Sequence, residues 1–129
     1  MTDEIYPAVT RELVRKRRDL VPAAATAFHD FSQAVFAPGA LSTQTKHLIA
    51  VAVAHVTQCP YCIKGHTRAA LREGTSDAEL MEAIWVAAEM RAGAAFAHSL
   101  IAIAEMDGDR DTANGHAGAG IDSGVHHAQ

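Results

Sequence analysis

An all-α fold is predicted from three features of this 129-residue sequence. Alanine is abundant while aromatic residues make up only 5% of the chain, and runs of β-branched residues are few. Apolar residues recur at helical spacing along most of the chain, and proline, serine and glycine stand where helices should begin or end. Alanine-rich segments of this kind favour close-packed helices. We therefore expect one domain of five or six helices, large enough for a core and small enough to gain from oligomerisation.

The first two predicted helices span Thr10–Asp19 and Pro22 to about Phe36. Leu13 and Val14 should face inward in the first helix. Proline suits the first position of a helix, so Pro22 marks the start of the second. In that second helix the apolar residues recur at helical spacing, which makes Phe28 and Phe31 expected core residues.

The third and fourth predicted helices flank the centre of the sequence. Ser42 is a good N-cap for a helix from about Thr43 to Thr57. That helix is almost entirely apolar from Leu48 to Val56, so it should be central and buried on most sides. The fourth helix, Pro60 to Glu73, is followed by Gly74, which is a typical C-terminal signal.

The fifth predicted helix begins at a capping box, Ser76-Asp77-Ala78-Glu79, and runs to about Met106. Gly93 is a position where this helix could bend or divide. From Asp107 onward the sequence is rich in glycine and poor in aliphatic residues, so such a tail buries little on its own. We therefore divide the chain into a helical domain, residues 1–106, and a Gly-rich tail, residues 107–129, which we expect to lie against another surface.

Cys59 and Cys62, the only two cysteines, enclose Pro60 and Tyr61 in a Cys-x-x-Cys motif. Such a pair can close a small reversible disulfide, and a helix that begins at the first cysteine lowers a thiol pKa from about 8.5 to roughly 3.5–7.5. His66 would lie one helical turn beyond Cys62 on the same face, where an imidazole can accept or return a thiol proton. The motif therefore predicts thiol–disulfide exchange.

Three other interpretations of the cysteine pair fit the sequence less well. A structural disulfide would close a loop too short to constrain much of the unfolded chain. A zinc site could draw on Cys59, Cys62 and His66, but the second half of a zinc motif is absent, and His55 could join only through an awkward bend. A thioredoxin-like fold needs a strand before the motif and a later cis-proline, whereas a helix precedes this motif and no proline follows Pro60. We expect no metal and no cofactor.

Charge and hydropathy exclude several classes of partner. The net charge of −4 gives no case for nucleic acid, and the basic run Arg15–Arg18 is interpreted as a solvated helix end. The acidic opening, Met1–Glu4, does not resemble a targeting signal, and the apolar run Leu48–Val56 is half the length of a membrane span. We expect a cytoplasmic protein without a membrane partner, a setting in which paired thiols are more often catalytic than structural.

The segment Lys46–His66, KHLIAVAVAHVTQCPYCIKGH, resembles the core of the AhpD-like alkylhydroperoxidases of the carboxymuconolactone decarboxylase superfamily. The similarity covers about residues 40 to 105. It continues through Ala69-Ala70, Gly74-Thr75-Ser76, Glu79, Glu82-Ala83, Met90–Ala94 and His98. It implies an AhpD-like helical bundle that assembles into a homo-oligomer, commonly a trimer or hexamer. It also implies that the cysteine pair reduces peroxides or disulfides at the expense of an external dithiol.

The resemblance further implies a role for each site residue. Cys62 would meet the peroxide, Cys59 would resolve the product, and His66 would belong to a proton relay. The relay of the family usually contains a glutamate twelve residues before the first cysteine, and His47 stands at that position here. A histidine can pass protons near neutral pH, since its ordinary pKa is about 6.5, but it is not a fixed negative charge.

The predicted function is therefore that of an antioxidant oxidoreductase, a thiol-dependent peroxidase or disulfide reductase, with Cys59, Cys62, His66 and His47 as catalytic residues. The alternative is a non-catalytic oligomeric redox sensor or scaffold, and turnover with peroxide and a reductant separates the two. A carboxymuconolactone decarboxylase-type lyase ranks below both, because that branch does not use this cysteine pair as its catalytic device. His55, inside the apolar run, is expected to be a hydrogen-bonded core histidine.

Overall fold

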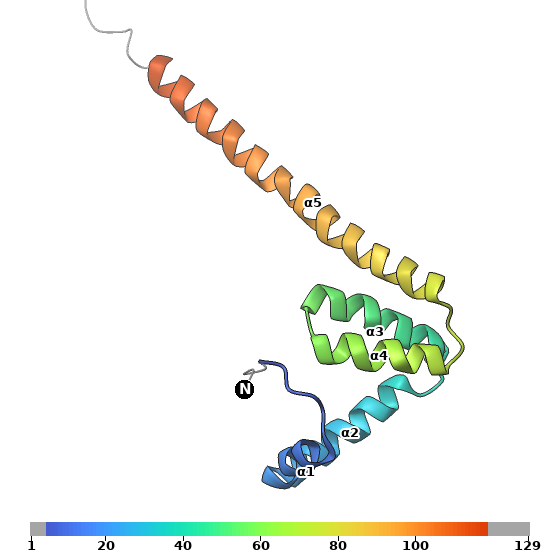
Figure 1. Ribbon diagram of the computed structural model, residues 1–129. Helices are drawn as coiled ribbons and strands as arrows, with labels where there is room; N and C mark the ends of the chain where they lie inside the picture. The colour runs from blue at the N-terminus through green and yellow to red at the C-terminus, as the bar shows by residue number, and fades with distance from the viewer. Residues whose placement is uncertain (1–4, 119–129) are drawn as a thin grey trace, which may run out of the picture. The chain divides into compact units, whose positions relative to one another are not determined.

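The structure is a computed structural model that describes the backbone of residues 5–118 and the side chains of residues 5–115. Five helices follow one another along this part of the chain, and it contains no strand (Figure 1). They are α1 (Arg11–Leu20), α2 (Pro22–Phe36), α3 (Thr43–Thr57), α4 (Pro60–Arg72) and α5 (Asp77–Gly118). The predicted all-α fold is confirmed.

Local capping explains why most of these helices begin where they do. The Thr10 hydroxyl accepts a hydrogen bond from the Leu13 N–H at 3.2 Å, and the Ser42 hydroxyl accepts one from the Thr45 N–H at 3.1 Å. Ahead of α5, the Glu79 N–H donates to the Ser76 hydroxyl at 3.1 Å, while the Ser76 N–H donates to the Glu79 carboxylate at 3.0 Å. These side chains satisfy N–H groups that have no partner inside the helix, and the predicted capping box is confirmed.

The last helix is longer than the sequence pattern predicts. We expected it to end near Met106, whereas α5 continues to Gly118 and passes through Gly93 without interruption. A glycine costs a helix only about 1 kcal/mol, and no proline follows Pro60 to block the backbone. Residues 119–129 and the surface that the tail was expected to contact lie outside the described residues, so the proposed boundary after residue 106 stays a prediction.

The chain forms two compact units, residues 1–88 and 89–129. In the first unit α3 and α4 lie side by side and antiparallel (Figure 1). Its small core joins Val51 of α3, Ala70 of α4 and Leu80 of α5. Leu48 and Ile84 pack against this cluster and are only partly buried. The described part of the second unit is the remainder of α5.

Burial differs from expectation in α1, α2 and α3. Leu13 and Val14 of α1, expected to face inward, are 48% and 40% exposed. Phe28 and Phe31, the predicted core residues of α2, are 69% and 64% exposed, so that prediction is wrong for the single chain. In α3, Val51 and Ala54 are buried but Val53 is about half exposed, so only one face of this helix is covered. Helical spacing identifies an apolar face, but it does not supply the element that covers it.

Helix α5 is long and apolar enough to cross a membrane by length and composition alone, with a window of mean hydropathy 1.2 within Asp77–Gly115. One helix of this kind is weak evidence, because a core helix of a soluble protein passes the same test. Only 6% of this 18-residue window is buried within the described part of the chain. This helix was predicted from the sequence, but only the shorter apolar run Leu48–Val56 was compared with the length of a membrane span.

Candidate active site

The turn between α3 and α4 sets the position of the cysteine pair. Gln58 takes the left-handed conformation, with φ 59° and ψ 47°, which is uncommon for a residue with a side chain. The Cys59 N–H donates to the Ala54 carbonyl at 3.1 Å, which closes the end of α3. The chain therefore reverses within two residues, and Cys59 becomes the N-cap of α4.

Cys59 and Cys62 are joined by a disulfide in the first turn of α4. Their Cα atoms lie 5.3 Å apart, a normal spacing for a bridged pair. The Cys62 N–H donates to the Cys59 sulfur at 3.3 Å, and both residues are half-buried. When the bridge opens, this N–H and the positive end of the helix stabilise a thiolate at Cys59.

His66, one turn further along α4, meets His47 of α3. Their Nδ1 atoms lie 3.1 Å apart and share a hydrogen bond. In a neutral pair one Nδ1 must donate and the other must accept, so a single proton lies between the two rings. The outer nitrogens of the pair are the two Nε2 atoms. One of them then carries a proton and the other carries a lone pair. The pair can thus both give and take a proton at its outer side.

Burial lowers the pKa of both histidines below their ordinary value. For His47 this desolvation is the main cause; the nearby Glu73 carboxylate raises the pKa and the Arg72 guanidinium lowers it. For His66 desolvation again comes first, and a charge on His47 lowers the pKa further. Both rings are therefore favoured in the neutral state near pH 7, in which one Nδ1 donates and the other accepts.

Phe36, the last residue of α2, stacks on both imidazoles. Its ring centroid lies 4.8 Å from that of His47 and 5.0 Å from that of His66, with interplanar angles of 11° and 24°. This contact was not predicted from the sequence. The place of Phe36 at the end of a helix, just before Pro38-Gly39, gives no signal of a site, because the contact depends on how α2 joins α3.

Tyr61, between the two cysteines, contacts the segment that precedes α1. Its hydroxyl donates to the Pro7 carbonyl at 2.9 Å, and its ring meets Tyr6 edge-on with the centroids 5.9 Å apart. The start of the described chain therefore lies against the cysteine motif, a contact between residues far apart in sequence.

The remaining sequence candidates lie outside this cluster. His55 donates from Nδ1 to the Val51 carbonyl at 2.7 Å, so its predicted hydrogen bond is confirmed, but the residue is only half-buried and its predicted place in the core is wrong. Within the described residues no three histidine, cysteine or acidic side chains form a group that could hold a metal ion. The structure joins Cys59 to Cys62 and His47 to His66, and the catalytic role of these four residues stays a prediction.

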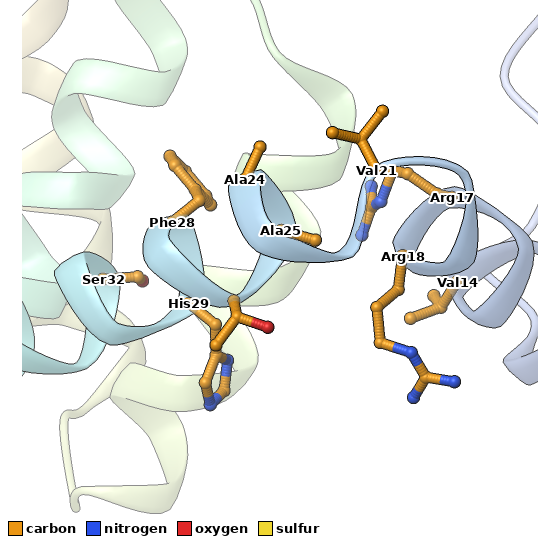
Figure 2. A pocket seen from close by; sticks show the side chains of 10 residues that line it. Val14, Arg17, Arg18, Val21, Ala24, Ala25, Phe28, His29 and Ser32 are labelled. Carbon is orange, nitrogen blue, oxygen red and sulfur yellow. The ribbon is translucent and has the colours of Figure 1, made fainter.

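An open groove of about 900 Å³ lies between α1 and α2, apart from the disulfide and the histidine pair (Figure 2). Val14, Arg17 and Arg18 line it from α1, and Ala25, Phe28 and Ser32 are among those that line it from α2. Arg17 and Arg18 occupy the last turn of α1, where Arg18 pairs with the exposed Asp19 at 2.9 Å. Such an exposed pair contributes little stability, in keeping with a solvated helix end.

Comparison with known proteins places this helical site in a family. The family model of the carboxymuconolactone decarboxylase family matches residues 22–105, from the start of α2 into α5. The chain therefore belongs to the carboxymuconolactone decarboxylase family, and its five helices and cysteine pair fit the AhpD-like members of that superfamily.

One curated relative and two solved structures are similar to this chain, and one of the structures is of a protein of the same family. The chain is 64% identical to uncharacterised protein 4 of the cox locus of Paracoccus denitrificans, over 63% of this chain and 73% of that protein. A crystal structure of a carboxymuconolactone decarboxylase family protein from Legionella pneumophila is 35% identical with a TM-score of 0.59, covering 61% of this chain and 70% of the other. A protein from Methanobacterium thermoautotrophicum is 37% identical with a TM-score of 0.60, covering 63% and 91%.

Proposed function

We propose that this protein is a thiol-dependent peroxidase or disulfide reductase. The observation that carries the proposal is the Cys59–Cys62 bridge at the start of α4, followed one turn later by the hydrogen-bonded pair of His66 and His47. A dithiol that closes reversibly exchanges two electrons, and each exchange also moves protons. A neutral histidine pair beside the thiols supplies the proton acceptor and donor that this chemistry needs.

In the oxidative half of the proposed reaction, the Cys62 thiolate attacks an oxygen of a hydroperoxide. A sulfur–oxygen bond forms, the oxygen–oxygen bond breaks, and the alkoxide takes a proton and leaves as an alcohol. The Cys59 thiolate then attacks the Cys62 sulfenic acid, the disulfide forms, and hydroxide leaves as water after it takes a second proton. The histidine pair receives each proton from a cysteine thiol and passes it to the departing oxygen.

In the reductive half, one thiolate of an external dithiol attacks the Cys62 sulfur. Cys59 then leaves as the thiolate that the Cys62 N–H stabilises. The second external thiol attacks the mixed disulfide and releases Cys62, so the external dithiol leaves as a disulfide and its two protons return to the cysteines. A disulfide substrate follows the same exchange in reverse. Peroxide and dithiol enter, and alcohol, water and disulfide leave.

A steady-state assay tests this proposal. Dihydrolipoamide serves as the dithiol, with hydrogen peroxide or an organic hydroperoxide as oxidant, and oxidation of the dithiol is followed over time. We expect turnover that is proportional to protein concentration and absent in Cys62→Ser. Turnover no greater than that of Cys62→Ser, although mass spectrometry shows that the disulfide opens and closes, would contradict the enzyme and support a redox sensor instead.

Exposed apolar side chains support the proposal that the protein works as a homo-oligomer, a trimer or hexamer. In the second unit Phe96, Leu100 and Ile103 follow helical spacing, so they share one face of α5, and Phe96 is 82% exposed. Large apolar surfaces of this kind are usually covered in the assembled protein. The same surface fits the alternative of an oligomeric sensor or scaffold whose assembly responds to the cysteine pair.

A further inference from the structure

We propose that Phe36 is the positioning residue of the histidine pair. It holds His47 and His66 in the one arrangement in which their Nδ1 atoms share a proton. This inference deepens the proposed function and rests on it for its effect on turnover, while its geometry stands on the stacked rings themselves.

One aromatic face covers two imidazoles here. The Phe36 ring stacks nearly parallel to His47, at 11°, and close to parallel to His66, at 24°, with centroid distances of 4.8 and 5.0 Å. The two imidazoles are inclined to each other by 35°, with centroids 5.3 Å apart. Rotation of either ring out of this arrangement breaks its stack on Phe36 and its hydrogen bond to the other ring together.

The backbone around Phe36 is itself fixed to the start of α3. The Thr43 hydroxyl donates to the Phe36 carbonyl at 2.9 Å. The Lys46 ammonium donates to the carbonyl of the next residue, Ala37. Both donors lie in the first turn of α3, immediately before His47. The end of α2 therefore cannot move without pulling on the turn that carries His47, which makes Phe36 part of the site although it lies in a different helix from either histidine.

The stack also determines how the pair holds protons. The apolar Phe36 ring removes water from one face of each imidazole, and this desolvation disfavours the charged forms. The ionisable groups around the pair are Arg72 at the end of α4 and Glu73 just after it, which act on His47, and Lys46 of α3, adjacent to His47 in sequence. Because the Nδ1 atoms share one proton, a first added proton goes to an outer nitrogen, and a second would leave the shared bond without an acceptor. The pair therefore passes one proton at a time.

Three variants test this role. Phe36→Leu keeps an apolar side chain but removes the aromatic face, Phe36→Tyr restores that face, and Phe31→Leu is the matched control, since Phe31 lies in the same helix and is exposed. Nitrogen-15 NMR of the histidine side chains measures their tautomers and pKa values. The rate of disulfide closure after a peroxide pulse measures the oxidative step. Circular dichroism checks folding, and Phe36→Met replaces the Leu variant if that variant unfolds.

We expect Phe36→Leu to lose the distinct tautomers, to raise both histidine pKa values toward the ordinary value of about 6.5, and to slow closure about tenfold, a part of what general acid–base catalysis supplies. Phe36→Tyr and Phe31→Leu should match the wild type. Unchanged histidine spectra in Phe36→Leu would overturn the proposal, as would equal changes in Phe36→Leu and Phe36→Tyr. Because the spectra need no turnover, they decide the role of Phe36 even if the protein shows no peroxidase activity.

Discussion

The α3–α4 hairpin and the part of α5 beyond residue 88 differ in what their apolar residues contact. In the hairpin Val51 is fully buried, and it packs with Ala70 of the facing helix. Beyond residue 88, Phe96, Leu100 and Ile101 are each at least 65% exposed. The hairpin thus carries the disulfide and the histidine pair within one chain, whereas α5 beyond residue 88 leaves large apolar side chains exposed. The proposed chemistry should therefore depend on local residues, and assembly should depend on α5.

The cysteine pair gives the largest expected effect on the hairpin side of this comparison. Cys62→Ser should abolish turnover with peroxide, because it removes both the thiolate that attacks the peroxide and the sulfur that the reductant attacks. Cys59→Ser should also stop turnover but leave a sulfenic acid at Cys62, since no neighbouring thiol remains to resolve it. Trapping with a sulfenic-acid reagent and mass spectrometry of the Cys59–Cys62 peptide distinguish the two variants. A sulfenic acid found on Cys59 instead would reverse these roles.

The α5 side is tested by a single charge on the exposed face. Leu100→Glu should dissociate the oligomer to a chain of 13.7 kDa, because a carboxylate buried in an apolar interface costs several kcal/mol. Asn114→Glu is the control, since it adds the same charge at a polar exposed position of the same helix. Light scattering across protein concentrations gives the masses. A wild-type mass near that of one chain would contradict the proposed oligomer. An unchanged mass in Leu100→Glu would show that the interface does not include Leu100.

The histidine pair links hairpin stability to pH. The folded state lowers the pKa of His47 and His66, so as pH falls the unfolded chain takes up protons first, beginning near its ordinary pKa of about 6.5. The free energy of unfolding should therefore fall as pH drops through about 6.5 toward the lower folded values, and then level off. Urea unfolding at fixed protein concentration and at several pH values measures the slope of the free energy of unfolding against pH. In His66→Gln the slope should be shallower, and a slope equal to that of the wild type would exclude the pair as its source.

The two turns that bound α4 give the smallest expected effects. Gly74 has φ +89° and Gln58 has φ 59°, so both adopt the left-handed conformation. Gly74→Ala should destabilise the protein by about 1 kcal/mol, while Gln58→Gly should be neutral or stabilising, since a side chain in this conformation costs roughly 1–2 kcal/mol. Denaturant unfolding midpoints measure both changes, provided that the dependence of the free energy of unfolding on denaturant concentration is the same in each variant. A destabilised Gln58→Gly would show that the Gln58 side chain contributes more than its backbone strain costs.

Local signals in the sequence predicted the helix starts correctly because the interactions that make them are local. Ser42 and the Ser76–Glu79 box bond to groups three residues away, so their order in the chain is sufficient. The Cys59–Cys62 pairing was predictable for the same reason. The place of His47 beside His66 followed only from the resemblance to a family, since composition and spacing do not fix which faces of two helices meet.

The features that sequence reasoning missed depend on contacts between distant segments. Phe36 reaches the histidines because Thr43 and Lys46 form hydrogen bonds to the carbonyl groups at the end of α2. No periodic sequence pattern predicts these contacts between two helices. Phe28 and Phe31 were expected in the core because their spacing defines an apolar face, yet the described part of the chain leaves both largely exposed. The extension of α5 to Gly118 was missed because glycine weakens a helix without ending it.

The order of the site residues along the chain has a consequence for biosynthesis. His47, Cys59, Cys62 and His66 all lie within two consecutive helices joined by a short turn. Contacts of such short sequence separation form quickly, and chains emerge from the ribosome N-terminus first. The hairpin can therefore assemble before α5 is complete. A nascent chain would then carry its thiol pair and histidine pair in place before synthesis of α5 is finished.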